Sequence, residues 1–103
     1  MIVKNINGTS ESTCTCGSWL NHWKAYSGQP LPTYCVERRC MKTPTLGAHV
    51  QKGSSTDRAW YIIPLCPDHN RKAESLDVSD SVALVPANVS ETCANKKAAS
   101  LSW

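Results

Sequence analysis

The sequence predicts a small α+β domain that a bound metal ion holds together. Three observations favour this class. The chain has 103 residues, which is the length of one compact domain. Two segments rich in apolar and β-branched residues are separated by turn residues. Six Cys and three His supply ligands for a cross-link, which a chain this small and without Phe is expected to need.

The cellular compartment decides whether these cysteines form disulfides or bind metal. Residues 1–8 are too few and too polar for the apolar core of a signal peptide. The chain contains no apolar run long enough to span a bilayer. We therefore expect a cytoplasmic protein without a membrane partner, whose reduced thiols bind metal. The alternative is an exported protein with three disulfides.

A short helix is expected near the N-terminus, over residues 19–26. Ser18 is a suitable N-cap, and Gly28 is expected to end the helix. The spacing of three aromatic side chains places them on one helix face, as is typical of a core contact: Trp19, Trp23 and Tyr26.

A β-hairpin is expected in the middle of the chain. Residues 46–51 and 60–65 have strand character, and residues 52–57 carry turn residues. A helix is expected to follow over residues 68–76, because Asp68 suits a helix first turn.

The chain is expected to form a single domain, 1–103, with its core in residues 33–78. Residues 1–13 are polar and predict a loose arm or one edge strand. Residues 81–86 predict a last strand, and residues 94–103 a loose C-terminus.

Two ligand pairs predict a zinc site. Cys35 and Cys40 are separated by four residues, and Cys66 and His69 by two. Zinc takes four such ligands in a tetrahedron, which closely spaced pairs reach with little backbone strain. A loop pair, a hairpin and a pair at a helix start together form the layout of a treble-clef domain. The alternatives are buried thiols or a disulfide.

The remaining cysteines leave several possibilities open. Cys14, Cys16 and Cys93 could form a second metal site with His22. A disulfide from Cys93 to Cys14 or Cys16 is the next possibility, and free thiols the third.

Residues 35–72 resemble the HNH nucleases, the zinc-stapled branch of the ββα-metal (His-Me finger) endonucleases. The parts that match are the Cys pair, a strand that ends in His, a second strand that ends Leu-Cys, a fourth ligand and a helix that opens with Asn. In this chain they are Cys35 and Cys40, Gly47 to Val50, Ile63 to Cys66, His69, and Asn70 to Lys72.

This resemblance implies an endonuclease that hydrolyses DNA phosphodiesters. His49 would be the general base, and Asn70 would help to hold a catalytic divalent cation such as Mg²⁺. Two positions depart from the family. Ala48 stands where an Asp or His often binds the cation, and Tyr61 lies near the place of an Asn that orients the His.

The mildly basic net charge of +3 is compatible with a phosphate partner. Two basic groups would contact phosphates if the partner is nucleic acid, and would otherwise be a solvated surface: Arg38, Arg39 and Lys42, and Arg71 with Lys72. The second functional hypothesis is a catalytically inactive treble-clef module that binds nucleic acid or a protein partner. The sequence does not predict an oligomeric state.

Overall fold

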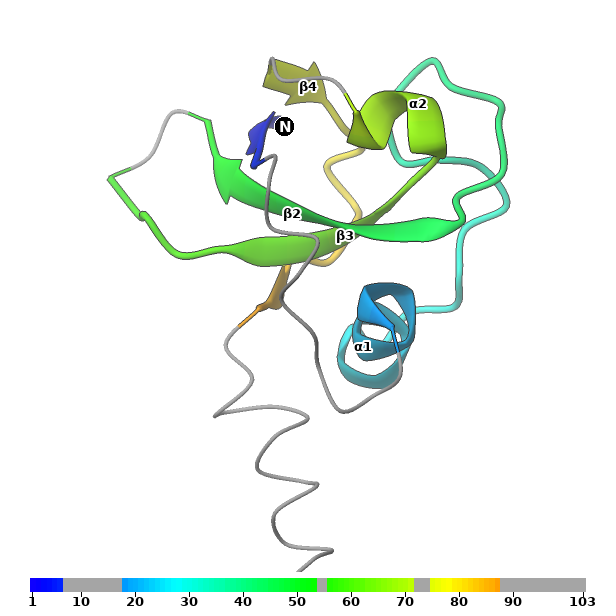
Figure 1. Cartoon of the computed structure of the whole chain (residues 1–103), viewed down its shortest axis with the longest axis horizontal. Helices are drawn as coiled ribbons and strands as arrows, with labels where there is room; N and C mark the ends of the chain where they lie inside the picture. Colours follow the sequence, from blue (N-terminus) through cyan, green and yellow to red (C-terminus); the bar gives the residue numbers. More distant parts are fainter. Residues whose placement is uncertain (7–17, 54–55, 72–74, 88–103) are drawn as a thin grey trace, which may run out of the picture.

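The computed structural model describes residues 1–6, 18–53, 56–71 and 75–87. In these residues five strands form one antiparallel sheet, and two helices lie on opposite sides of its central hairpin (Figure 1). The elements in chain order are β1 (Ile2–Asn5), α1 (Trp19–Tyr26), β2 (Leu46–Lys52), β3 (Tyr61–Leu65), α2 (Pro67–Asn70), β4 (Ser75–Asp77) and β5 (Val85–Pro86). The predicted α+β class is confirmed.

The β2–β3 hairpin is the centre of the sheet, whose strand order is β4-β1-β2-β3-β5. Its register pairs Ala48 with Ile63 and His49 with Ile62. Successive side chains of a strand point to opposite faces, so Ile62 and Ile63 enter different cores, and both are fully buried. Burial on both faces explains why β3 is an almost continuous apolar run.

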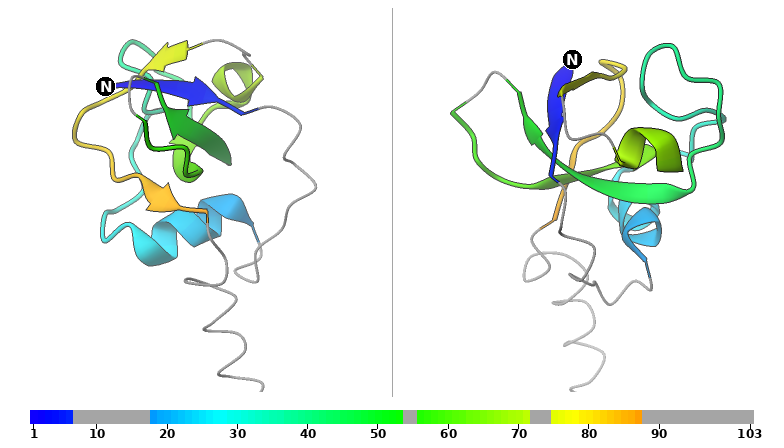
Figure 2. Two further views of the ribbon diagram at one scale, coloured as in Figure 1. Left: turned by 90° about the vertical axis from the view of Figure 1, so that its left-hand side faces the viewer. Right: turned by 45° about the horizontal axis from the view of Figure 1, so that its top comes forward.

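The two cores lie on opposite sides of the hairpin, and Figure 2 shows α1 on one of these sides and α2 on the other. The larger core contains the β-strand residues Val3, Ala48, Val50, Ile63 and Leu65, together with Cys35, Val36, Cys66, Leu76 and Val78. The smaller core contains Trp23, Ile62 and Val85, and Trp19 and Tyr26 pack against it. The aromatic face of α1 is therefore a core contact, as the spacing predicts.

Helix α1 begins and ends at the expected residues. The Ser18 hydroxyl accepts a hydrogen bond from the amide of Asn21 at 3.1 Å. Gly28 has a φ of 69°, in the left-handed region that glycine adopts easily. A Cβ at Gly47 of β2 would lie 2.3 Å from the backbone carbon of Trp19. This glycine therefore allows the start of α1 to approach the sheet closely.

Strand β1 corrects the expectation of a loose arm or an edge strand for the part of residues 1–13 that the structure describes. It pairs with β2 on one side and with β4 on the other. Val3 is fully buried in the larger core. A four-residue strand with two apolar side chains gives a weak local signal, and its place depends on pairing with residues about 50 and 70 positions away.

The predicted helix over residues 68–76 is wrong beyond its first turn. Helix α2 ends at Asn70 with Arg71 as its C-cap, and residues 75–77 form β4. Leu76 is buried in the larger core, where β4 pairs with β1. Tertiary pairing therefore overrides local helix propensity at Ser75 and Leu76. The predicted last strand, 81–86, is shortened to the two residues of β5.

The segment of residues 36–38 connects strand β3 to strand β4 at the opposite end of the sheet, and we name it the clasp. The Val36 amide donates to the carbonyl of Pro64 in β3 at 3.3 Å, and the Ser79 amide donates to the Val36 carbonyl at 2.9 Å. The Arg38 amide donates to the carbonyl of Asp77 in β4 at 3.0 Å. The clasp thus links β3 to the outer edge of β4, so that backbone bonds nearly encircle the larger core.

Candidate metal centre

The four predicted ligands come together at one end of the larger core. The thiol sulfurs of Cys35, Cys40 and Cys66 and a ring nitrogen of His69 all lie within 4.8 Å of one another. The Sγ atoms of Cys40 and Cys66 are 3.7 Å apart. His69 Nδ1 lies 3.3 Å from Cys66 Sγ and 3.6 Å from Cys35 Sγ. The predicted Cys₃His cluster is confirmed as a group positioned to hold a metal ion.

Three of the six ligand separations match a tetrahedral zinc ion, and the other three are at most 4.8 Å. With zinc–sulfur bonds of about 2.3 Å and zinc–nitrogen bonds of about 2.0 Å, the edges of the tetrahedron are about 3.8 Å for two sulfurs and about 3.5 Å for sulfur and nitrogen. The observed separations of 3.7, 3.6 and 3.3 Å lie close to these values. Three thiols and an imidazole are also ligands that suit zinc better than a hard cation.

Local backbone structure brings each ligand pair together. The amide of Cys40 donates to the Glu37 carbonyl at 3.1 Å, and the amide of Cys35 donates to the Lys42 carbonyl at 2.8 Å, which folds residues 35–42 into a tight loop. Cys66 directly follows β3 and is the N-cap residue of α2, so His69 lies one helical turn away.

Backbone amides around the cluster favour thiolates. The amide of Lys42 donates to Cys40 Sγ at 3.4 Å. Burial opposes ionisation of Cys66, but bonds from the amides of His69 and Asp68 and from the neighbouring thiols hold its pKa below the ordinary value. Burial raises the pKa of Cys35 to about 12. A metal cation beside these sulfurs would compensate the cost of ionising Cys35, because a coordinating thiol is deprotonated.

The structure separates the two residues that the nuclease resemblance implies for catalysis. The contact of its ring with Trp19 places His49 on the hairpin face that α1 covers. Asn70 belongs to α2, which lies on the opposite side of the hairpin (Figure 1). His49 is 5 % exposed, and the centroid of its ring lies 4.5 Å from that of Trp19 and 6.0 Å from that of Trp60. Burial, with a smaller contribution from His22, lowers the pKa of His49 to about 4.

The other histidine of this side is a structural residue. His22 is fully buried in α1, and its Nε2 lies 2.8 Å from the carbonyl of Pro86. The second metal site that would include His22 also needs Cys14, Cys16 and Cys93, which lie outside the described residues.

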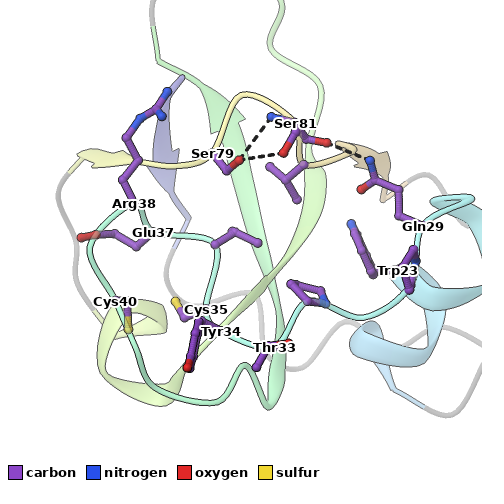
Figure 3. Close-up of a pocket in the computed structure, with 14 residues that line it drawn as sticks. Trp23, Gln29, Thr33, Tyr34, Cys35, Glu37, Arg38, Cys40, Ser79 and Ser81 are labelled. Atoms are coloured by element: carbon purple, nitrogen blue, oxygen red, sulfur yellow. Dashed lines mark hydrogen bonds between the residues drawn. The ribbon is translucent and has the colours of Figure 1, made fainter.

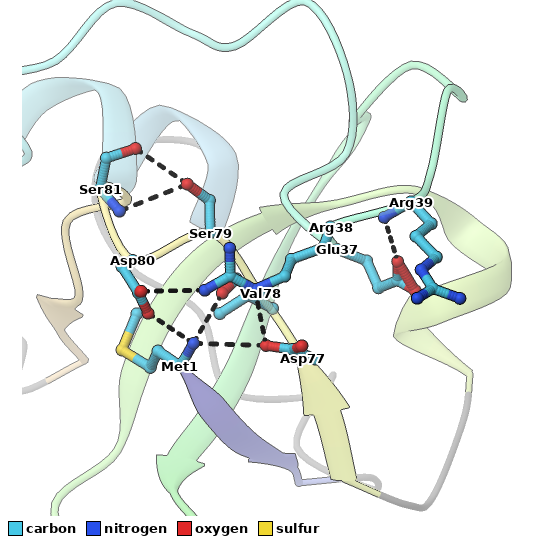
Figure 4. Close-up of polar contacts among 9 residues, drawn as sticks. All are labelled: Met1, Glu37, Arg38, Arg39, Asp77, Val78, Ser79, Asp80 and Ser81. Carbon is cyan, nitrogen blue, oxygen red and sulfur yellow. Dashed lines mark hydrogen bonds and ion pairs between the residues drawn. The ribbon is translucent and has the colours of Figure 1, made fainter.

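Most of the predicted phosphate-binding side chains are paired with acids. Lys42 and Arg71 both form ion pairs with Asp68. Arg38 bonds to Asp77 and Asp80, each at 2.9 Å, and the Met1 ammonium joins the same two carboxylates (Figure 4). Arg39 has no ion pair among the described residues, and Lys72 lies outside them.

A cavity of about 530 Å³ opens beside the loop of residues 35–42, which we name the metal loop (Figure 3). Its lining includes the ligands Cys35 and Cys40 together with Trp23, Tyr34 and Val82. Pro30 and Pro32, which the sequence predicts only as extended linker residues, also line the cavity. Sequence reasoning missed this cavity, because residues from α1, the clasp and the segment before β5 meet only in the folded chain.

Sequence reasoning also missed Glu37, which contacts the metal ligands through its carboxylate and its backbone. Its carboxylate Oε2 lies 3.4 Å from His69 Nε2. One signal could have indicated it, since Glu37 is the acidic residue that stands between Cys35 and Cys40 in the sequence.

No family model matches the chain, and no curated protein or solved structure matches it. The assignment of the site therefore depends on the ligand geometry alone. Within the described residues, no helix is long and apolar enough to cross a membrane.

Proposed function

We propose that the chain is a zinc-stabilised, treble-clef-like module that recognises a protein partner and has no hydrolytic activity. The observation that carries the proposal is the Cys₃His cluster. Zinc with four protein ligands has no position left for water or substrate, which is the arrangement of structural rather than catalytic sites. The metal would supply folding energy by joining the loop of residues 35–42 to the start of α2.

The environment of His49 supports the inactive hypothesis over the endonuclease hypothesis. A general base works best with a pKa near the operating pH, and the pKa of His49 is about 4. Its ring contacts two indoles on the face away from α2. Ala48 offers no ligand to a divalent cation, so Asn70 would stand without an acidic neighbour in β2.

The surface around the metal loop supports a protein partner. Tyr34 is exposed next to Cys35, and Met41, which is 75 % exposed, follows Cys40. The hydrogen bond between Cys35 and Lys42 brings these two positions close together. Leu31 and Leu46 are also exposed. Large apolar side chains beside a cavity are typical of contact surfaces in proteins.

The charges of the same region favour a protein over nucleic acid. A surface that binds phosphates needs basic side chains that can replace counterions. Asp68, Asp77 and Asp80 already neutralise Lys42, Arg71 and Arg38 in part. Such ion pairs would have to break before a phosphate could bind.

Two assays test the proposal. Plasmid DNA incubated with the protein and Mg²⁺ or Mn²⁺ should remain uncut by the wild type and by His49→Ala alike. Cleavage by the wild type that His49→Ala abolishes would establish the nuclease instead. Binding of short single- and double-stranded oligonucleotides, followed by fluorescence anisotropy at low salt, should be absent; tight binding that weakens steeply with salt would favour a nucleic-acid partner.

The contact surface is tested by a double variant. Tyr34→Ser with Met41→Ser should keep the fold and the bound zinc, because both side chains are exposed. The double variant should fail to bind a partner protein that binds to the wild type and that mass spectrometry identifies. A matched control is Ile2→Ser, which also replaces an exposed apolar side chain, but in β1. Equal retention by all three proteins would refute the proposed surface.

A further inference from the structure

We infer that Glu37 is a positioning residue of the metal centre, which orients His69 for zinc and couples zinc binding to closure of the clasp. This inference depends on the proposed function, because it assigns a role at the same site. Glu37 lies in the middle of the clasp, within the loop that joins Cys35 to Cys40.

The side chain of Glu37 faces the imidazole of His69 from the side opposite the thiols. His69 Nδ1 points toward Cys66 and Cys35, at 3.3 and 3.6 Å, and Nε2 lies 3.4 Å from Glu37 Oε2. A carboxylate in this place favours the tautomer with its proton on Nε2, which leaves the lone pair of Nδ1 free for the metal. The geometry therefore selects one tautomer of His69.

The carboxylate is itself held in place. Glu37 Oε1 accepts a hydrogen bond from the Arg39 amide at 2.6 Å. Its side chain is 21 % exposed and that of His69 is 15 % exposed, so solvent screens their contact less than it screens surface pairs. A fixed, half-buried carboxylate restrains the imidazole more strongly than a mobile one could.

The backbone of Glu37 contacts the other two parts of the site. Its amide bonds to the Cys35 sulfur, and its carbonyl accepts from the Cys40 amide. The same residue forms an antiparallel bridge with Val78, which follows β4. Glu37 therefore contacts three of the four ligands and also the segment that closes the sheet.

These contacts predict the effect of losing the carboxylate. Carboxylates that orient a ligating His typically contribute about 10–100-fold to metal affinity. We expect Glu37→Ala to weaken zinc binding by about 100-fold and to speed its dissociation. Glu37→Gln can still accept a hydrogen bond through its amide oxygen, so we expect a loss of about 10-fold.

The control is Asp68→Asn. It removes a negative charge one residue before His69, but Asp68 bonds to Lys42 and Arg71 on the surface. It should leave zinc affinity within about twofold of the wild type. If charge near the metal had a general effect on zinc affinity, Asp68→Asn would show it. An effect that acts through the orientation of His69 would not appear in Asp68→Asn.

The experiment measures zinc affinity by competition with a chromogenic chelator and the zinc release rate after excess chelator. Long-range ¹H–¹⁵N spectra of the zinc-loaded proteins report the His69 tautomer. The wild type should show Nδ1 bound to zinc and a protonated Nε2. The Co²⁺-loaded forms give absorption bands that report the ligand geometry.

The inference is supported if affinity falls in the order wild type, Glu37→Gln, Glu37→Ala, with Asp68→Asn like the wild type. If Glu37→Ala does not fold with zinc, the zinc affinity, release rate and tautomer of Glu37→Gln test the inference. Equal affinity, release rate and tautomer in Glu37→Gln and Asp68→Asn would overturn the inference while leaving the zinc site intact. A wild type that binds no zinc would instead refute the proposed function.

Discussion

The two faces of the β2–β3 hairpin are stabilised by different means. On one face, side chains of the larger core pack beneath the Cys₃His cluster, and α2 consists of four residues. On the other face, α1 has eight residues and packs Trp23 onto Ile62, and among the described residues no metal-binding group lies on this face. The Trp23 indole also donates to the Ala83 carbonyl at 2.9 Å.

This difference shows where a small chain needs a metal. The α1 face buries a large indole, which contributes several kcal/mol of apolar burial by itself. The opposite face must instead hold the loop of residues 35–42, in which only half of the side chains are exposed, and a bound zinc ion would connect this loop to α2. We therefore expect the loss of stability from substitutions at the Cys₃His cluster to depend on zinc. The loss of stability from substitutions on the α1 face should be independent of zinc.

The largest expected effect is the loss of one thiolate. Cys66→Ser removes a fully buried ligand and should abolish the folded state under conditions where the wild type is folded. Structural zinc contributes about 10–16 kcal/mol of apparent binding energy in zinc-finger peptides, which is as much as the whole stability of a typical domain, about 5–15 kcal/mol. Circular dichroism and ¹H–¹⁵N spectra measure the effect. A chelator should unfold the wild type in the same way, and added zinc should refold only the wild type. A folded, zinc-independent Cys66→Ser protein would contradict the account.

On the other face, Trp23→Ala should cost about 3–5 kcal/mol of unfolding free energy, because the indole is 1 % exposed. Denaturant unfolding at saturating zinc measures the loss. The matched control is Trp60→Ala, which removes an indole that is 43 % exposed and should cost less. The Co²⁺ spectrum of folded Trp23→Ala should equal that of the wild type. A changed spectrum would show that the two faces are not independent.

The close approach of α1 to β2 gives a third prediction. Gly47→Ala should cost about 3 kcal/mol, because its Cβ would lie 2.3–2.6 Å from backbone atoms of Trp19 and Leu20. Gly53→Ala is the milder comparison and should cost less, since its Cβ would lie 2.9 Å from the Ile2 Cγ2 methyl and 3.1 Å from the Ile2 carbonyl oxygen. Thermal unfolding compares the two. Equal midpoints would mean that α1 lies farther from the sheet than the structure shows.

A smaller effect is expected from pH on the α1 face. The pKa of His49 is about 4 in the folded chain and 6.5 in the unfolded chain, so the unfolded state binds more protons between these values. Stability from this residue is full above about pH 6.5 and decreases as the pH falls, by about 2 kcal/mol near pH 5. His49→Gln at saturating zinc should lack this pH-dependent loss of stability. Protonation of the thiolates should affect the wild type and His49→Gln equally. Identical slopes of stability against pH would contradict the buried neutral imidazole.

Local signals were sufficient for the metal ligands and the hairpin. The spacings from Cys35 to Cys40 and from Cys66 to His69 place each pair within one loop or one helical turn, and the structure unites the pairs. Helix α1 was likewise predictable from Ser18 and the aromatic spacing. These features depend on residues that are near one another in the sequence.

The features that could not be predicted depend on distant contacts. Strand β1 has four residues, and β4 has three. Each is too short to show a clear alternation, and each is positioned by its partners. Residues 68–76 favour a helix locally, but Leu76 gains more from burial beside Val3 than from a longer α2. The position of His49 on the α1 face follows from strand register, which the nuclease resemblance does not specify.

The metal content of the intact protein tests the central claim most directly. Native mass spectrometry of the wild type and of Cys66→Ser, purified without added metal or chelator, counts the ions on each chain. We expect bound zinc in the wild type and one zinc fewer in the variant. A wild type without zinc, an equal count in both proteins, or six blocked thiols would contradict it.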